Sequence, residues 1–497
     1  MKPILNLIAS GSFLAALAIA QTPGYTLTDL GPASNPFSQA TFVAGNGAIT
    51  GLSTVSGSQH AVVWQSGRMF DLATPGLGGP NSFAGSINEL GQVLIQGELS
   101  SKDPNNENFC GYGDGLICLP YLWQFGVVTP LPTLGGNNAS FNSMNKLGEV
   151  AGYAENSTRD PKCPSQPAAN GTGPHVLDFE PVIWGPGQGQ IRQLLLLPGD
   201  TVGLALWIND RGQAAGISGS CANTVVPGFT AGPHAVLWDS DGTVHDLGNL
   251  GGTSNPALLA VGNGALVVNN RGEVTGLSAL KGNTTFHPFL WTQQTGIQDL
   301  GVLPGDLVGA GLGMNNKGVV VGASISAPGP AGGNPRAFLW QNGVMSDINA
   351  LVPSNAGLHL LTANAINDQG QIVGFGATAS GEIHAFLATP SYLSSTGATT
   401  TSATNAVVTP VDLTTSQSSV VLDGSGSTSS SGNLSYVFTV LPGGNVPALL
   451  QTLTSSSATV EFVNGPGLYL LQLIVTDASG NSAKSQVIML NYQPSAN

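Results

Sequence analysis

The acidic residues whose types and spacing could hold a ligand are concentrated in two segments. The first begins with Asp103 and Glu107 and continues through Tyr112 and Asp114, so it mixes carboxylates, amides and an aromatic ring. The second has a similar composition and contains Asp160, Asp178 and Glu180. Carboxylate and amide oxygens bind Ca²⁺ and hydrogen-bond to sugar hydroxyls, although the spacing is not that of an EF-hand loop. Each segment is predicted to be either a Ca²⁺ or glycan site or a solvated insertion.

One aromatic residue departs from the repeat in which it stands. Trp207 precedes an Ile-Asn turn at a position where other copies carry the smaller residues Ser86, Ser143, Gly313 and Ala365. Its side chain is expected either to point into a central channel, where it could stack on a sugar, or to pack against its neighbours. The sequence leaves both interpretations open.

No catalytic residues are predicted. Neither a Gly-x-Ser-x-Gly nor a His-Glu-x-x-His motif stands in an interpretable catalytic context. A glycosidase needs paired carboxylates, but many acidic residues recur at one repeat position, namely Asp29, Asp71, Asp246, Asp299 and Asp347. Four of the seven histidines also share one register, which favours a structural role beside a neighbouring blade for His60, His234, His287 and His384.

These residues belong to a unit that recurs between residues 25 and 388. Each copy has a strand ending in Asp-Leu, an apolar stretch closed by an Asn-x-x-Gly turn, a Val/Gly-rich strand and a strand ending in Leu-Trp. The Leu-Trp strands recur about every 50 to 60 residues, a length that suits one four-stranded unit. A single unit cannot bury its apolar faces, so the pattern predicts an all-β array of seven four-stranded antiparallel blades.

The order of the strands predicts a closed ring with two different faces. The array begins with a lone strand at 25–31 and ends with a lone strand at 384–388. If these two strands pair, they complete the seventh blade and leave no sheet edge open, so we expect a closed seven-bladed β-propeller rather than an open solenoid. The short Asn-x-x-Gly turns, with Gly in a left-handed conformation, should lie on one face. Every long loop should lie on the other.

The repeat resembles a known family. The motifs His-Ala-Phe-Leu-Trp, Asp-Leu-Gly-x-Leu-Gly-Gly and Ile-Asn-x-x-Gly-Gln-Val-Val-Gly are similar to the HAF repeat, named for its His-Ala-Phe triplet. The resemblance covers residues 25–390 and is weakest in the first unit, where Ala44 replaces the turn Asn. It implies an exported bacterial protein with a repeat array, and it brings no catalytic residues.

A second domain is expected after the repeats. Residues 391–410 are rich in Ser, Thr and Ala, which is the composition of a flexible linker. Residues 411–497 contain alternating strands spaced for a small β-sandwich. The stretches from Val421 to Ser427 and from Val475 to Gly480 resemble a PKD-type immunoglobulin-like domain, although its usual Trp-x-Phe-Gly-Asp-Gly stretch is missing. The resemblance implies a spacer or a weak binding module.

Composition and cysteine usage indicate the compartment. Residues 1–20 have the features of a secretory signal peptide, which leaves residues 21–390 for the propeller. A net charge of -14 with only 13 Lys and Arg disfavours nucleic-acid partners, and no later segment could insert into a membrane. Four cysteines fit an oxidising compartment, and of three possible connectivities we predict Cys110 with Cys118 and Cys163 with Cys221. No metal site is expected at these cysteines, because His and carboxylate ligands do not stand at short spacing.

These observations favour an exported, non-enzymatic scaffold that binds a polysaccharide or a protein through its long-loop face. Such a protein would be secreted, extracellular or at the cell surface, and it would need no cofactor unless the acidic segments bind Ca²⁺. One alternative is a carbohydrate-active enzyme, either a hydrolase, a lyase or a copper oxidase. Another is a purely structural cell-surface component. Fold analogy alone does not decide among these functions.

Overall fold

The structure is a computed structural model that describes most of the chain. The described residues are 24–31, 37–65, 68–72, 77–88, 90–124, 126–161, 176–221, 224, 231–254, 261–327, 333, 335–391, 404–410, 412–429, 433–440, 448–450, 456–463, 467–477 and 482–494. The predicted signal peptide, residues 1–20, lies outside these ranges, and so does most of the predicted linker. Among the described residues, no helix is long and apolar enough to cross a membrane.

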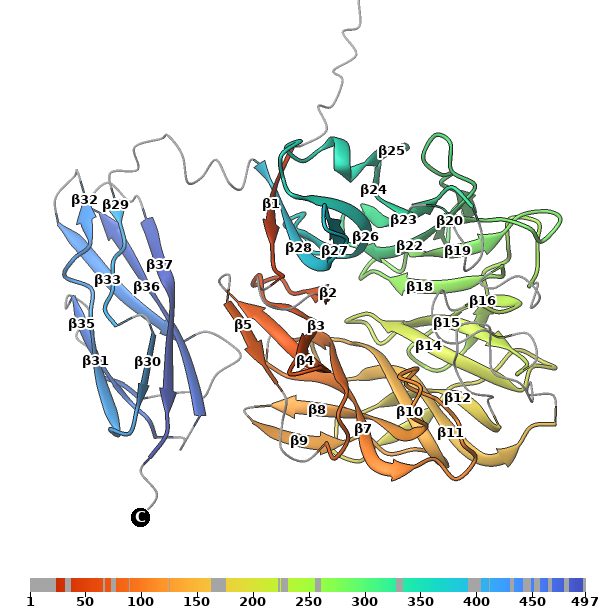
Figure 1. Cartoon of the computed structure of the whole chain (residues 1–497), viewed down its shortest axis with the longest axis horizontal. Coiled ribbons are helices and arrows are strands. Elements are labelled where there is room, and N and C mark those ends of the chain that lie inside the picture. Colours follow the sequence, from red (N-terminus) through yellow and green to blue (C-terminus); the bar gives the residue numbers. More distant parts are fainter. Residues whose placement is uncertain are drawn as a thin grey trace, which may run out of the picture.

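Seven four-stranded antiparallel sheets form the blades of a propeller ring (Figure 1). Blade 1 contains β2 (Ser38–Val43), β3 (Ile49–Val55), β4 (Ser58–Gln65) and β5 (Arg68–Asp71). Blade 2 contains β6 (Ser82–Ile87), β7 (Val93–Lys102), β8 (Leu116–Gln124) and β9 (Val127–Pro130). Blade 3 contains β10 (Gly135–Met144), β11 (Val150–Arg159), β12 (Leu177–Trp184) and β13 (Ile191–Gln193). Blade 4 contains β14 (Val202–Ile208), β15 (Ala214–Gly219), β16 (His234–Trp238) and β17 (Val244–Asp246). Blade 5 contains β18 (Gly264–Val268), β19 (Val274–Ala279), β20 (Phe286–Thr292) and β21 (Gly296–Asp299). Blade 6 contains β22 (Val308–Met314), β23 (Val320–Ile325), β24 (Pro335–Gln341) and β25 (Val344–Asp347), and the 3-10 helix η1 (Ile348–Ala350) follows it.

Blade 7 confirms the predicted closure of the ring. It contains β26 (Leu358–Ile366), β27 (Ile372–Thr378), β28 (Ile383–Pro390) and the N-terminal strand β1 (Tyr25–Asp29). Strand β1 pairs antiparallel with β28, so the two ends of the array share one sheet. The first strand of each blade contacts the first strands of both neighbouring blades, and these contacts run around the ring without a break. The expected seven-bladed architecture is therefore correct.

The turn between the first two strands has the same construction in every blade. Its glycine has a positive φ, for example +83° at Gly47 and +74° at Gly212, which side chains rarely adopt. The first strand also carries a register shift just before the turn, such as the one between Ala205 and Trp207. These features confirm the predicted tight turns, and they bring the turns of all seven blades to one end of the channel.

The strands of neighbouring blades are joined by the repeat's tryptophans. Trp64, Trp184 and Trp238 are almost fully buried. Each indole N–H donates to a carbonyl of the preceding blade, at 3.0 Å to Leu30, 2.8 Å to Pro132 and 2.6 Å to Leu195. A buried indole needs such an acceptor, so each of these residues fills the interface and also fixes its register. The expected role in packing between blades is observed.

The repeat histidines pair with the repeat aspartates. Nδ1 of the imidazole lies 2.9 to 3.0 Å from the carboxylate in His60–Asp71, His234–Asp246, His287–Asp299 and His384–Asp29. The partner belongs to the next strand of the same blade, whereas the sequence suggested a contact with a neighbouring blade. In blade 6, Arg336 replaces the histidine and bonds to Asp347. These residues therefore hold the outer strand in blades 1, 4, 5, 6 and 7.

The C-terminal residues form a separate β-sandwich. One sheet has the strand order β30 (Asp412–Thr415), β37 (Ser482–Tyr492), β36 (Gly467–Asp477) and β33 (Leu434–Val440). The other sheet has the order β31 (Ser419–Asp423), β35 (Ser457–Glu461) and β34 (Ala448–Leu450). The short strand β29 (Thr404–Asn405) pairs with β32 (Thr428–Ser429). Its core includes Leu422, Phe438, Val460, Tyr469 and Leu471. This fold is the one predicted from the alternating pattern.

Candidate functional site

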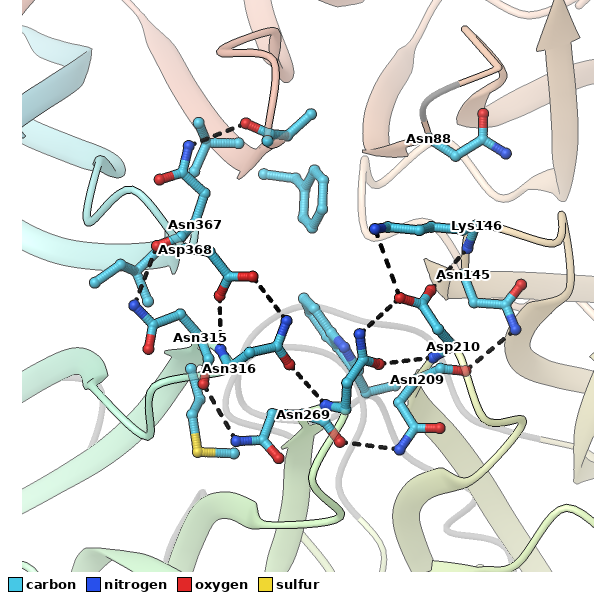
Figure 2. Close-up of a pocket in the computed structure, with 18 of the residues that line it drawn as sticks. Asn88, Asn145, Lys146, Asn209, Asp210, Asn269, Asn315, Asn316, Asn367 and Asp368 are labelled. Carbon is cyan, nitrogen blue, oxygen red and sulfur yellow. Dashed lines mark hydrogen bonds and ion pairs between the residues drawn. The ribbon is translucent and has the colours of Figure 1, made fainter.

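A cavity of about 300 Å³ opens at the end of the channel where the short turns meet (Figure 2). All seven blades contribute to it, because the first strand of each blade ends there. Its lining consists of Phe42, Val43, Ala44, Gly45, Ile87, Asn88, Met144, Asn145, Lys146, Trp207, Ile208, Asn209, Asp210, Val268, Asn269, Asn270, Met314, Asn315, Asn316, Ile366, Asn367, Asp368 and Gln369. We call this site the channel mouth. It lies on the tight-turn face, opposite the long loops on which the sequence placed ligand binding.

In blades 3 to 7, the first asparagine of the turn builds the wall of the channel mouth. In blade 6, Oδ1 of Asn315 accepts the backbone N–H groups of Lys317 and Val319, at 3.0 and 3.1 Å. Its Nδ2 then donates to the backbone carbonyl of Asn367 in the next blade at 3.1 Å. The same bridge to the next blade is made by Asn145, Asn209, Asn269 and Asn367. We call this series of amides the asparagine belt.

In blades 3 to 7, the second residue of the turn forms a polar rim above the belt. Asp210, Asn270, Asn316 and Asp368 each accept the backbone N–H of the preceding blade's second turn residue through Oδ1, at 2.8 to 3.0 Å. Two of the amides also donate to carboxylates: Asn270 to Asp210 at 2.6 Å and Asn316 to Asp368 at 2.8 Å. The ammonium group of Lys146 lies 4.0 Å from Asp210. The rim thus presents amides, two carboxylates and one ammonium group.

The floor of the channel mouth is apolar. Trp207 is half-buried there, and its ring centroid lies 6.1 Å from that of Phe42 on the other side of the channel, with the planes tilted by 43°. Ile87, Met144 and Met314 also line this floor. Trp207 packs against neighbouring core clusters as well, so it lies in the channel and also contributes to packing, while stacking on a sugar stays a prediction. An aromatic floor below a rim of amides and carboxylates is suited to a molecule with an apolar face and polar edges.

The belt is interrupted in blades 1 and 2, and the rim is interrupted in blade 1. Blade 1 has Ala44 and Gly45 at the two turn positions, so it offers no amide to either series. In blade 2, Nδ2 of Asn88 reaches Sδ of Met144 at 3.7 Å instead of the backbone carbonyl of Asn145. Figure 2 shows the hydrogen bonds running from Asn367 to Asn145 and stopping before Asn88. We call this interruption the open sector.

The acidic residues predicted from the first long loop lie buried around one asparagine. Nδ2 of Asn138 lies 2.9 Å from Asp103, 3.2 Å from Glu107 and 3.1 Å from Glu155. Burial, together with a hydrogen bond to Glu107 and its charge, raises the pKa of Glu155 to about 10. A neutral carboxyl can share its proton with the neighbouring carboxylate, which explains how these groups tolerate burial. The cluster stabilises the loops, and a large ligand has no access to it.

Tyr112 and Asp114, the other two predicted residues of this loop, lie near the carboxyl group of Glu98. Burial and the charge of Asp114 raise the pKa of Glu98 to about 7. Burial also raises the pKa of Tyr112, and the charges of Glu98 and Asp114 contribute. The predicted disulfide between Cys110 and Cys118 closes this loop, with their Cα atoms 5.7 Å apart. The structure therefore brings these residues together, but as a packed loop and not as an open site.

The second acidic segment also forms carboxyl pairs. Burial raises the pKa of Asp178 to about 6, with the charge and hydrogen bond of Asp160 adding to it. Burial and the charge of Asp178 raise the pKa of Glu180 to about 7. One oxygen of Asp178 and one of Glu180 have no hydrogen-bond partner. The predicted pairing of Cys163 with Cys221 stays a prediction, because Cys163 lies outside the described residues.

Ca²⁺ binding by these segments stays a prediction. Within the described part of the chain, no three His, Cys, Asp or Glu side chains are grouped so that they could hold a metal ion. The carboxylates around Asn138 accept hydrogen bonds from its amide, and burial together with Glu107 favours the neutral form of Glu155. The arrangement can therefore respond to pH, whereas the channel mouth has the geometry to bind a molecule.

Comparisons with known proteins identify the class of the smaller domain. Residues 409–490 match a family model described as a PKD domain, which bears out the predicted PKD resemblance. The protein is thus an all-β chain with a seven-bladed propeller and a C-terminal PKD-like domain. No curated protein matches the chain. The likeness of the repeats to the HAF family and the predicted export stay predictions.

Two solved structures are similar to parts of the chain. One is the PKD domain from the KIAA 1837 protein, which is 25% identical, covers 20% of this chain and 95% of that chain, and has a TM-score of 0.17. The other is the dipeptidyl peptidase 4 of Porphyromonas gingivalis, which is 9% identical, covers 68% of this chain and 50% of that chain, and has a TM-score of 0.33. At these TM-scores, neither structure supports an inference about activity.

Sequence reasoning missed the belt and the rim. It interpreted the Asn-x-x-Gly motif only as a turn, because one unit does not show that seven turns converge. A signal was nevertheless present, since the residue after the turn Asn varies among Lys146, Asp210, Asn270, Asn316 and Asp368 but stays polar. Turn geometry does not require that choice, whereas a common polar site does.

Proposed function

We propose that this protein is an exported, non-enzymatic binding scaffold whose ligand is a saccharide held at the channel mouth. The observation that carries the proposal is the position of Trp207 in the floor of a cavity of about 300 Å³ whose rim is polar. An aromatic ring can support the C–H face of a sugar, while amides and carboxylates bond to its hydroxyls. On this proposal the ligand binds at the tight-turn face rather than at the long-loop face that the sequence suggested.

The two alternatives receive less support. An enzyme would need paired carboxyls that a substrate can reach, but Glu107 and Glu155 are buried and surround Asn138. At the channel mouth, Asp210 and Asp368 bond to neighbouring turns and hold the rim together. A purely structural component would not need an aromatic floor in an open cavity. The PKD-like domain fits a spacer or an accessory binding module in any of these functions.

Thermal denaturation of the full chain in the presence of neutral oligosaccharides tests this proposal. A ligand that binds only the folded protein adds about 2.7 kcal/mol to the free energy of unfolding at a concentration 100 times its Kd. The melting temperature rises as a result. Trp207→Ala should abolish that increase. Trp340→Ala is the matched control, because Trp340 is a half-buried tryptophan that does not line the cavity. An unchanged response in Trp207→Ala, or no response to any saccharide, would contradict the proposal.

A further inference from the structure

The open sector presents hydrogen-bonding groups that the other blades satisfy internally. The turn carbonyls of Asn209, Asn269, Asn315 and Asn367 each accept the turn N–H of their own glycine and the amide of the preceding blade. In blade 2, the carbonyl of Asn88 accepts the N–H of Gly91 at 3.1 Å, and blade 1 has no amide to provide the second bond. This second acceptor position of the Asn88 carbonyl is therefore left for another donor.

A donor is left without its counterpart on the other side of the same gap. The backbone N–H groups of Lys146, Asp210, Asn270 and Asn316 each donate to the second turn residue of the following blade. Blade 7 would continue this series from Asp368 into blade 1, but Gly45 has no side chain. The open sector thus offers an acceptor at Asn88 and a donor at Asp368, and both residues line the cavity.

We infer that the ligand is a neutral polyhydroxylated molecule that occupies the open sector, where its hydroxyl groups replace the asparagine side chains that blade 1 lacks. This inference rests on the proposed function and names the chemistry of its ligand. A hydroxyl group both donates and accepts a hydrogen bond, so hydroxyls on different parts of one molecule can fill the second acceptor position of the Asn88 carbonyl in blade 2 and accept the N–H of Asp368 in blade 7. The apolar face of such a ring would lie over Phe42 and Trp207.

Other classes of ligand fit the open sector less well. An anion would meet the carboxylates of Asp210 and Asp368 on the rim, with only Lys146 in the cavity lining to offset them. A metal ion would need a converging set of ligands, which the described residues do not provide. A fully apolar molecule would leave the second acceptor position of the Asn88 carbonyl and the N–H of Asp368 unfilled. A neutral polyol avoids all three costs.

The gap can be closed by giving blade 1 the Asn-Asn pair that blades 5 and 6 carry. Ala44→Asn/Gly45→Asn introduces both side chains, and a Cβ added at Gly45 meets nothing within 4 Å. Without ligand, this variant should melt about 2 °C or more above the natural protein, because it completes the belt. Asp241→Asn is the control: it places an asparagine on a turn outside the cavity and should leave the melting temperature unchanged.

Binding is then measured by calorimetric titration with maltose, cellobiose, chitobiose and myo-inositol, and with digalacturonate as the anionic probe. The expected result is that at least one neutral probe binds the natural protein and the Asp241→Asn control, and that Ala44→Asn/Gly45→Asn binds it at least about tenfold more weakly. Equal binding by the closed variant would overturn the inference but leave the proposed function intact. No binding of any neutral probe to the natural protein would overturn both. Stronger binding of digalacturonate would overturn the neutral class.

If the double variant fails to fold, the single change Ala44→Asn provides the test instead. It introduces only the asparagine that the belt lacks in blade 1. A melting temperature below that of the natural protein for a correctly folded Ala44→Asn would show that the interruption is not a site an amide can fill. That result would overturn the inference independently of any ligand.

Discussion

At the scale of single residues, the turn asparagine combines two roles that sequence patterns treat separately. Asn315 orders its own turn through Oδ1 and joins the next blade through Nδ2. Removing one partner from buried hydrogen bonds costs about 1 to 3 kcal/mol, because the remaining groups lose their solvation as well. The motif Asn-x-x-Gly therefore specifies both a turn and an interface between blades.

We predict that Asn315→Ala lowers the free energy of unfolding by about 2 to 4 kcal/mol, because three hydrogen bonds are lost at a buried site. Chemical denaturation measures this change. Asn249→Ala is the matched control, since the exposed Asn249 accepts one bond from Gly251 and should lose less than about 1 kcal/mol. A similar loss in both variants would contradict the role of the belt.

The carboxyl pairs of blades 2 and 3 predict a dependence of stability on pH. The pKa of Asp178 in the folded protein is about 6, and those of Glu98 and Glu180 are about 7. All three are above the unfolded values of about 4. A raised pKa contributes stability below the unfolded value, and that stability is lost as the pH rises through the folded value. The melting temperature should therefore fall by about 3 °C or more between pH 5 and pH 8.

Asp178→Asn/Glu180→Gln tests this origin of the pH dependence. Neither amide titrates, so the difference between the melting temperatures at pH 5 and pH 8 should become smaller than in the natural protein. A natural protein that is more stable at pH 8 than at pH 5 would contradict the assignment of the raised pKa values.

At the scale of elements, the pairing of β1 with β28 holds the ring closed. His384 bonds to Asp29 across this pair, and its side chain is 10% exposed, against 39% for His234 in the equivalent pair of blade 4. Gly31 lies against the same ring, and an added Cβ there would stand 2.3 Å from the imidazole of His384. The closure is thus tightly packed around one histidine.

We predict that His384→Ala destabilises the protein more than His234→Ala, by about 1 to 3 kcal/mol. The reason is that the first change leaves Asp29 without its partner at the pairing of strands from the two ends of the array, whereas blade 4 is continuous in sequence. Denaturation curves of the two variants provide the comparison. Equal effects would show that closure is not specially dependent on this residue.

At the scale of the whole molecule, ring closure removes the exposed edge that a propeller blade would otherwise present. Deleting residues 24–31 removes β1 and exposes the backbone of β28. We expect the shortened chain to associate into oligomers or aggregates, which size-exclusion chromatography would detect. A monomeric, fully stable product would show that β1 is dispensable.

Much of this architecture could be predicted from the sequence, because it follows from repetition. The Leu-Trp strands, the positive-φ glycines and the lone first strand together predicted seven blades and their closure. The site could not be predicted in the same way. Trp207 was identified as exceptional, but its partner Phe42 lies in a blade across the ring, and the burial of Glu107 and Glu155 depends on Asn138. Contacts between distant copies are set by the ring, and no single unit encodes them.

The most direct test of ligand binding at the channel mouth is the spectrum of the indole N–H groups in protein labelled with nitrogen-15 tryptophan. The chain has 7 tryptophans, and Trp207→Phe assigns the signal of interest. We predict that a neutral oligosaccharide shifts the Trp207 signal and leaves the signal of Trp238, which is buried in the same blade, in place. A titration that leaves Trp207 unchanged would contradict the central claim of a saccharide site at the channel mouth.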